Sequence, residues 1–148
     1  CRIENPMEGS GKMGRVINPD SVGKDRTRLV KSTVLAMREL MRQTQPDDTS
    51  RDMAAYIALA LLEIAATIDP SVGAWEKKGY WVKADRFRLE WEWSGRAGET
   101  MRKAVLTDDW ATIARTAALV GGKFINVKLP ERHRLGTPWV GAYAHLKG

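Results

Sequence analysis

Cysteine and histidine are scarce in this chain of 148 residues. Cys1 is the only cysteine, so no disulfide can form within the chain, and a fold held together by disulfides is excluded. The two histidines, His133 and His145, stand twelve residues apart in the last part of the chain. A zinc site needs a cluster of Cys, His or carboxylate ligands, and the sequence therefore predicts neither a metal site nor a cofactor.

Motifs for nucleotide and nucleophile chemistry are missing as well. The stretch 9–12 resembles the end of a phosphate-binding loop, but Met13 stands where that loop requires serine or threonine. No Gly-x-Ser-x-Gly motif for a serine nucleophile occurs. A small enzyme that uses carboxylates assembled from distant positions stays an alternative, because one sequence does not reveal such a site. We expect a protein that is not an enzyme.

Long hydrophobic runs are lacking too. The longest, Met53 to Leu62, continues to Ile68 with only Glu63 and Thr67 breaking it, and Asp52 and Asp69 bound it below transmembrane length. The first residues lack the pattern of a secretory signal, so we expect a cytoplasmic protein without membrane contact. Hydrophobic residues make up 43% and charged residues 28%, a balance that is typical of a soluble globular domain.

The first residues are rich in glycine and proline and lack hydrophobic periodicity. We expect residues 1–23 to form an irregular arm or linker. Cys1 stands where an initiator methionine is expected, which indicates a processed chain, a fragment, or residues added before Met13. Residues 1–12 are therefore either native or added, and both alternatives stay open.

Helical periodicity dominates the middle of the chain. Apolar residues recur with a spacing of 3.6 over residues 22–43, and the alanine-rich stretch 50–69 predicts a central helix that other helices approach closely. Thr49 followed by Asp52 resembles a capping box at the start of that helix, and Asp69-Pro70 predicts its end. A shorter helix is predicted over 108–120, with Thr107 as its N-cap and Gly121-Gly122 as its stop.

The segment 72–105 carries about nine turns of helical pattern with two apolar stripes. Residues 86–93 alternate as a strand would, but the longer periodicity favours one helix. Its second stripe predicts an association surface made by Tyr80, Phe87 and Trp91. An unbroken helix of this length would span about 51 Å, against roughly 40 Å for the whole domain. It must therefore bend near Ser94-Gly95 or Gly98, or project towards another chain.

Two charged residues interrupt apolar surfaces of these helices. Glu63 is the only charge inside the central helix, and Arg86 breaks the first apolar stripe of the next one. An ion pair is the arrangement in which buried charges are tolerated. We therefore predict a buried ion pair between Glu63 and Arg86.

Positive charge is concentrated in two segments of a chain whose net charge is +6. Residues 24–44 hold six Lys and Arg against two acids, and residues 121–148 hold five against one. Five cations of the first segment fall within a helical sector of about 80°: Lys24, Arg28, Lys31, Arg38 and Arg42. The tail adds Arg132 and Arg134. This is the charge pattern of a nucleic-acid binder, although solvated basic faces are also common on ordinary helical proteins.

Two of the six tryptophans are candidates for stacking on unpaired bases. Trp81 falls on the polar side of its predicted helix among lysines, and Trp139 lies in the basic tail. The remaining tryptophans are better explained by packing in the core.

Together these patterns predict an all-α, four-helix bundle-like single domain. A helical core over 24–120 lies between the arm 1–23 and a basic, irregular C-terminal arm over 121–148. The leading hypothesis is a small non-enzymatic binding module that contacts nucleic acid through the basic helix face and tail. The alternative is an oligomeric or adaptor subunit of a protein assembly, in which the second stripe and the arms bind protein.

Overall fold

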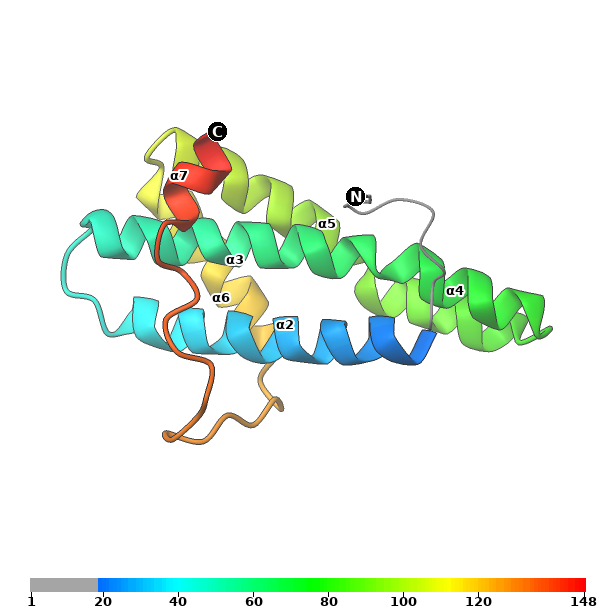
Figure 1. The fold of residues 1–148 in the computed structure, drawn as a ribbon. Helices are drawn as coiled ribbons and strands as arrows, with labels where there is room; N and C mark the ends of the chain where they lie inside the picture. Colours follow the sequence, from blue (N-terminus) through cyan, green and yellow to red (C-terminus); the bar gives the residue numbers. More distant parts are fainter. Residues whose placement is uncertain (1–18) are drawn as a thin grey trace, which may run out of the picture.

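The computed structural model describes residues 19–148, and every regular element in this range is an α-helix (Figure 1). The all-α prediction is confirmed. The helices are, in chain order, α2 (Pro19–Met41), α3 (Asp48–Ala66), α4 (Ile68–Lys77), α5 (Trp81–Leu106), α6 (Trp110–Lys123) and α7 (Ala142–Lys147). Helix α6 is steeply inclined to α2 and α3 in Figure 1, and the expected bundle arrangement is not confirmed.

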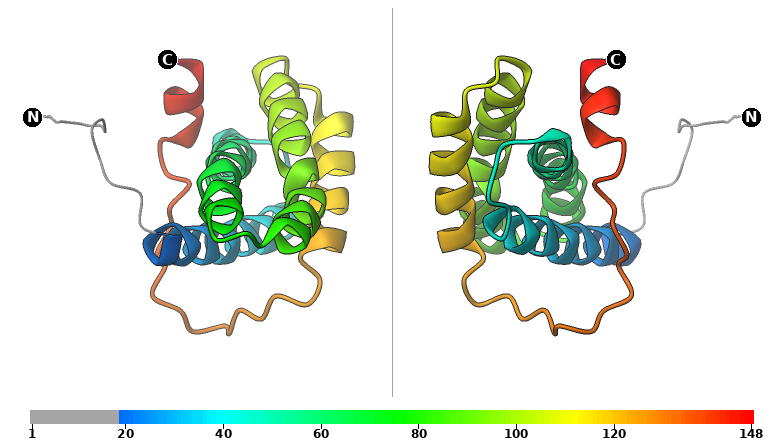
Figure 2. Two further views of the ribbon diagram at one scale, coloured as in Figure 1. Left: turned by 90° about the vertical axis from the view of Figure 1, so that its right-hand side faces the viewer. Right: turned by 90° about the vertical axis from the view of Figure 1, so that its left-hand side faces the viewer.

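Helix α3 occupies the centre of the fold. It packs against α5, α2 and α7, which surround it in the end-on views of Figure 2. Its buried side chains alternate between small and large: Met53, Ala54, Ala55, Ile57, Ala58, Ala60, Leu61 and Ile64. The small residues let three neighbours approach one helix, as the alanine-rich sequence predicts.

Helices α3 and α4 form a nearly continuous rod. Thr67 joins them with a helical backbone (φ −82°, ψ −11°), and the rod Asp48–Lys77 is long and apolar enough to cross a membrane by length and composition. The predicted helix end at Asp69-Pro70 lies three residues beyond the end of α3 at Ala66, and Pro70 stands instead in the first turn of α4, where a missing N–H costs nothing. The apolar side chains of α3 form the core of the fold, which explains the composition of the rod.

The segment 72–105 is two helices and not one. Gly79 adopts a left-handed conformation (φ +79°), its N–H donates to Glu76 O at 3.0 Å, and the Tyr80 N–H donates to Trp75 O at 2.9 Å. This pair of bonds is a Schellman motif, which ends α4. Helix α5 then returns along α4, and the turn between them projects past the beginning of α2 (Figure 1). Helix α5 is continuous through residues 94–98, where a bend is predicted, and the turn at Gly79 is what shortens the segment.

Two helix starts differ from the predicted ones by two residues. The Asp47 carboxylate accepts from Ser50 N at 2.8 Å and caps α3, and the Asp109 carboxylate accepts from Thr112 N at 3.2 Å and caps α6. The predicted caps are Thr49 and Thr107, and threonine also favours the N-cap position. The sequence therefore predicts each helix start to within two residues but not the residue that caps it. Hydrogen bonds lower the pKa of both carboxyls: the Ser50 amide donates to Asp47, and the hydroxyl and the amide of Thr112 donate to Asp109.

The C-terminal arm wraps back over the domain. Helix α6 continues through Gly121-Gly122 to Lys123, and an irregular segment over residues 124–141, called the strap below, passes beneath α2 (Figure 2). Trp139 is buried at the end of the strap. Helix α7 then packs on α3, where the Asp52 carboxylate accepts from Tyr143 N at 2.9 Å and Gly141 N at 3.3 Å.

Helices α3 and α5 approach each other closely at Gly98. A Cβ atom at this position would lie 3.0 Å from Leu62 Cγ and 3.1 Å from Leu61 Cβ, whereas one at Gly73 in α4 would have nothing within 4 Å. Gly98 is therefore required by the space between the two helices, and Gly73 is not.

The same substitution at these two glycines should have different effects. We expect Gly98→Val to lower the free energy of unfolding by about 1–3 kcal/mol, because its methyl groups must push α3 and α5 apart. Gly73→Val serves as the control and should change it by less than about 0.5 kcal/mol. Urea denaturation measures both, and equal losses would contradict the close packing at Gly98.

Candidate functional site

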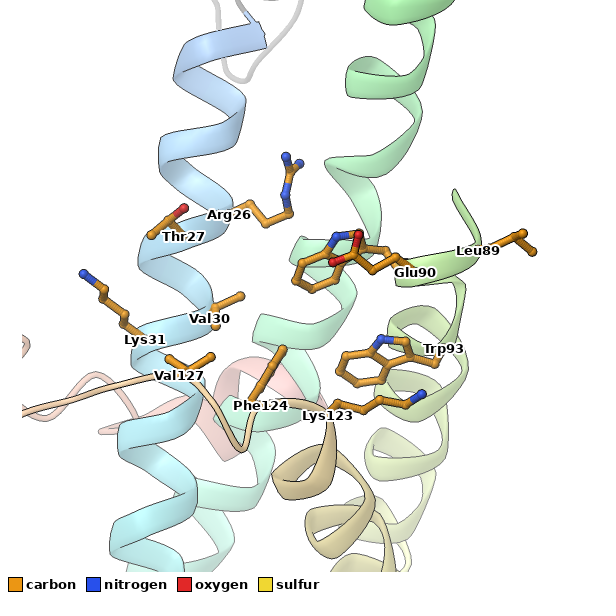
Figure 3. A pocket seen from close by; sticks show the side chains of 11 residues that line it. Arg26, Thr27, Val30, Lys31, Leu89, Glu90, Trp93, Lys123, Phe124 and Val127 are labelled. Atoms are coloured by element: carbon orange, nitrogen blue, oxygen red, sulfur yellow. The ribbon is translucent and has the colours of Figure 1, made fainter. Parts of the chain in front are cut away.

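An open groove of about 610 Å³ lies between α2, α5 and the beginning of the strap (Figure 3). The rings of Trp93 and Phe124 lie between the two helices, and Arg26 extends from α2 towards the helices opposite. A second hollow of about 740 Å³ continues the groove along α2, and Arg26 and Thr27 line both. The two hollows together are called the basic groove below.

The basic groove is lined by five cations and one carboxylate. The cations are Lys24, Arg26, Lys31, Lys83 and Lys123, and the carboxylate is Glu90. They come from α2, from α5 and from the last residue of α6. Charges of one sign that line a concave surface reinforce one another's field, so this surface attracts anions.

Aromatic rings form a connected series beneath these cations. Trp75 and Phe87 meet edge to face with their centroids 4.7 Å apart, and Phe87 lies 6.3 Å from Trp91. Trp91 then stacks on Trp93 at 6.3 Å, and Phe124 meets Trp93 at 5.3 Å. The series, called the aromatic cluster below, joins α4, α5 and the start of the strap, and all of its rings except Phe87 line the basic groove.

Arg26 connects α2 to this cluster and to the joint of the central rod. Its Nη1 donates to Thr67 Oγ1 at 3.0 Å and to Ser71 Oγ at 3.1 Å. Its guanidinium carbon lies 4.6 Å from the centroid of Phe87, a distance that permits a cation–π interaction. Burial lowers the pKa of Arg26 and the negative charge of Glu90 opposes this, but the guanidinium stays protonated at neutral pH.

Two lysines rest on the rings in the same way. Lys83 Nζ lies 4.6 Å from the centroid of Trp75, and Lys123 Nζ lies 5.7 Å from that of Trp93. Both lysines are exposed, so the rings hold the ammonium groups in place without neutralising them.

The predicted basic face of α2 divides into two halves. Lys24, Arg28 and Lys31 in the first half are exposed, and Arg28 forms a surface ion pair with Asp25 at 2.9 Å. Arg38 and Arg42 in the second half hold the strap. Two of the five cations therefore have a structural role, and the free part of the face is the part beside the basic groove.

The strap is bound by two hydrogen bonds, from Arg38 in α2 and from Arg42 just after it. Arg38 Nη1 donates to Leu129 O at 3.1 Å, and Arg42 Nη2 donates to Glu131 Oε1 at 2.9 Å while Nη1 donates to Glu39 Oε2 at 2.9 Å. The hydrogen bond and charge of Arg42, followed by the charge of Arg38, lower the pKa of Glu131.

The candidate residues of the tail differ in their exposure to solvent. Arg132 and Arg134 are exposed on the strap, as a binding role requires. Trp139 is only 7% exposed and belongs to the core, so the prediction that it stacks on bases is wrong. The glycine- and proline-rich tail predicts an arm outside the core, but the strap returns the end of the tail, with Trp139, to α3.

Trp81 lies at the turn of the α4–α5 hairpin and is 60% exposed. Tyr80 beside it is 54% exposed. The rest of the predicted association stripe faces inwards, because Phe87 and Trp91 belong to the aromatic cluster. Only the end of this stripe at Tyr80 is available to a partner.

The buried ion pair between Glu63 and Arg86 is wrong. Both side chains are exposed, and no ion pair joins them in the part of the chain that the structure describes. The prediction depends on residues 72–105 being one helix with Arg86 on its first apolar stripe. The turn at Gly79 instead makes α5 return along α4 with Ala84 facing inwards at this level.

Arg26, Lys83 and Lys123 are the functional candidates that the sequence analysis missed. Arg26 had a detectable signal, because it precedes Val30 and Thr33 by four and seven residues on the buried stripe of α2. A cation on an apolar stripe indicates a specific partner. Lys83 and Lys123 had no such signal, since their roles depend on which rings the fold places beneath them.

Metal chemistry gains no support from the geometry. Among residues 19–148, no three or more His, Cys, Asp or Glu side chains are grouped in a way that could hold a metal ion. The chemistry that this site offers is therefore attraction of anions and contact with aromatic or apolar groups.

Replacing Arg26 tests its connecting role. We expect Arg26→Ala to lower the free energy of unfolding by about 1–2 kcal/mol, because two hydrogen bonds from a charged donor and a cation–π contact are lost. Arg28→Ala is the matched control, and its exposed ion pair should contribute less than about 0.5 kcal/mol. Equal effects in urea denaturation would show that Arg26 is an ordinary surface residue.

The contact between the strap and α2 can be followed through Glu131. Its carboxylate should titrate below the ordinary glutamate pKa of 4.5, and Arg42→Ala should return the pKa towards that value. A lowered pKa means that this contact stabilises the fold fully above pH 4.5 and is lost as the pH falls through the folded-state value. Side-chain carboxyl NMR measures the pKa directly. An unchanged pKa in Arg42→Ala would contradict the contact.

Comparison of the chain with protein families, with curated proteins and with solved structures finds no match, so an assignment of function depends on the geometry described above.

Proposed function

We propose that this protein is a non-enzymatic helical module that binds nucleic acid through the basic groove and the free half of the basic α2 face. The observation that carries the proposal is the charge of the groove, where five cations face one carboxylate over an aromatic floor. A polyanion with flat, apolar groups is the ligand that matches both properties.

Phosphate contact is supported by the exposure of the cations. Lys24, Arg28 and Lys31 lie four and seven residues apart on one side of α2, which places them within about 11 Å along the helix axis. Exposed cations in such a row can each displace a counterion from a phosphate backbone. Arg38 and Arg42 contribute to the field, but their hydrogen bonds to the strap occupy them.

Charge reversal separates specific contacts from net charge. We expect the double variant Lys24→Glu/Lys31→Glu to weaken binding of labelled DNA or RNA about tenfold or more at low salt and to reduce the salt slope by about two. The control Lys103→Glu/Arg115→Glu makes the same change in net charge at exposed positions outside the groove. Fluorescence anisotropy at salt concentrations between about 50 and 200 mM measures both.

The control variant shows whether a loss of nucleic-acid binding comes from the groove or from the change in net charge. If both double variants weaken binding equally, the attraction is a property of net charge and the groove has no special role. If the unmodified protein binds neither DNA nor RNA at low salt, the proposal is wrong.

The second candidate function is an oligomeric or adaptor subunit. It is favoured by the exposed apolar side chains of the hairpin turn, namely Tyr80, Trp81 and Val82. Light scattering of the unmodified protein and of Trp81→Ser tests it. A mass above one chain that falls to one chain in the variant supports assembly through the hairpin turn, and a single-chain mass for both contradicts self-assembly there.

A further inference from the structure

The basic groove does not end at Trp75. Lys83 lines the second hollow and also a third hollow of about 550 Å³, which Gly79, Tyr80, Trp81 and Val82 complete at the hairpin turn. Adjacent hollows thus share Arg26 and Thr27 at one junction and Lys83 at the other. They form one concave path from the start of the strap to the projecting turn.

Positive charge persists along the path up to the turn. Lys77 and Lys78 at the end of α4 are also exposed. The nearby carboxylates are already engaged, because Arg88 forms ion pairs with Asp85 at 3.3 Å and with Glu76 at 3.5 Å. The lysines of the turn therefore keep their charge available for an anionic ligand.

The end of the path offers free aromatic surface, which its middle does not. Trp93 and Phe124 are buried, and Trp91 packs against both. Trp81 and Tyr80 are more than half exposed, and no aromatic ring packs on Trp81 within residues 19–148. A tryptophan among lysines on a projecting turn is suited to stack on a base whose phosphates the lysines hold.

We infer that the path binds a single strand of nucleic acid, with its phosphates along Lys31, Arg26, Lys24 and Lys83 and an unpaired base stacked on Trp81. The inference rests on the proposed function and specifies its ligand. Trp81 and Trp93 are twelve residues apart in α5, or about 18 Å, which accommodates about five stacked nucleotides. A duplex keeps its bases paired and stacked on one another, so it offers Trp81 nothing to stack on.

The test compares three labelled probes of about twelve nucleotides: oligothymidine, the same chain with abasic sugars, and a DNA duplex. Anisotropy titrations use the unmodified protein, Trp81→Ala and Trp81→Phe, with Leu119→Ala on α6 as the control for loss of an exposed apolar side chain. Trp81 is exposed at a turn, so its variants should fold, and circular dichroism verifies this.

We expect the unmodified protein to bind oligothymidine about fivefold or more tighter than the abasic chain. Trp81→Ala should remove that preference while leaving the salt slope unchanged, and Trp81→Phe should retain most of it. Lys83→Ala should instead reduce the salt slope by about one. Leu119→Ala should match the unmodified protein.

The possible outcomes distinguish a failure of the single-strand inference from a failure of the proposed function. If the protein binds all three probes equally, or if Trp81→Ala keeps the preference for oligothymidine, the inference is overturned while nucleic-acid binding stands. If none of the probes binds, the proposed function itself fails. If light scattering shows a mass above one chain that Trp81→Ala abolishes, the turn is an interface between copies and the inference is overturned.

Discussion

The guanidinium of Arg26 is the contact on which the candidate site depends. It connects α2 to Thr67 and Ser71 at the joint of the central rod and lies over Phe87 in the aromatic cluster. Its direct hydrogen-bond partners are hydroxyl oxygens and its ring partners are neutral, so the positive charge is held in place without being cancelled. A carboxylate in the same position would have cancelled the charge of Arg26 and reduced the positive charge of the groove. Because its partners are neutral, Arg26 both stabilises the packing of α2 and contributes its positive charge to the basic groove.

The sequence predicts much of this fold but little of its site. Apolar periodicity located α2, α3 and α6 to within a few residues, because a helix in contact with a core must present one apolar side. The turn at Gly79 was missed since the apolar pattern of α4 continues in phase into α5, and a glycine on an apolar stripe also suits close helix packing. Gly98 is such a packing glycine. Only the structure around each residue distinguishes a packing glycine such as Gly98 from a turn glycine such as Gly79.

The site was less predictable because its residues become neighbours only in three dimensions. Lys24, Arg28 and Lys31 share one helical sector, and the sequence predicts their common side correctly. Lys123 and Lys83 join them from other helices, which no local pattern could indicate. Trp139 is the opposite case, a residue that is predicted in the site but lies in the core. A tail rich in glycine and proline gives no sign that its tryptophan returns to the core.

The path of the strap has a consequence for how the chain reaches its final form. Synthesis proceeds from the N-terminus, so the strap and α7 are the last described segments to leave the ribosome. Until then α2 and α3 must hold each other through their own apolar contacts, while Arg38, Arg42 and Asp52 lack the partners that they have in the finished fold. During that interval the cations of the second half of the basic face have no contact with the strap. Docking of the last residues thus engages Arg38 and Arg42 and leaves the half beside the groove free.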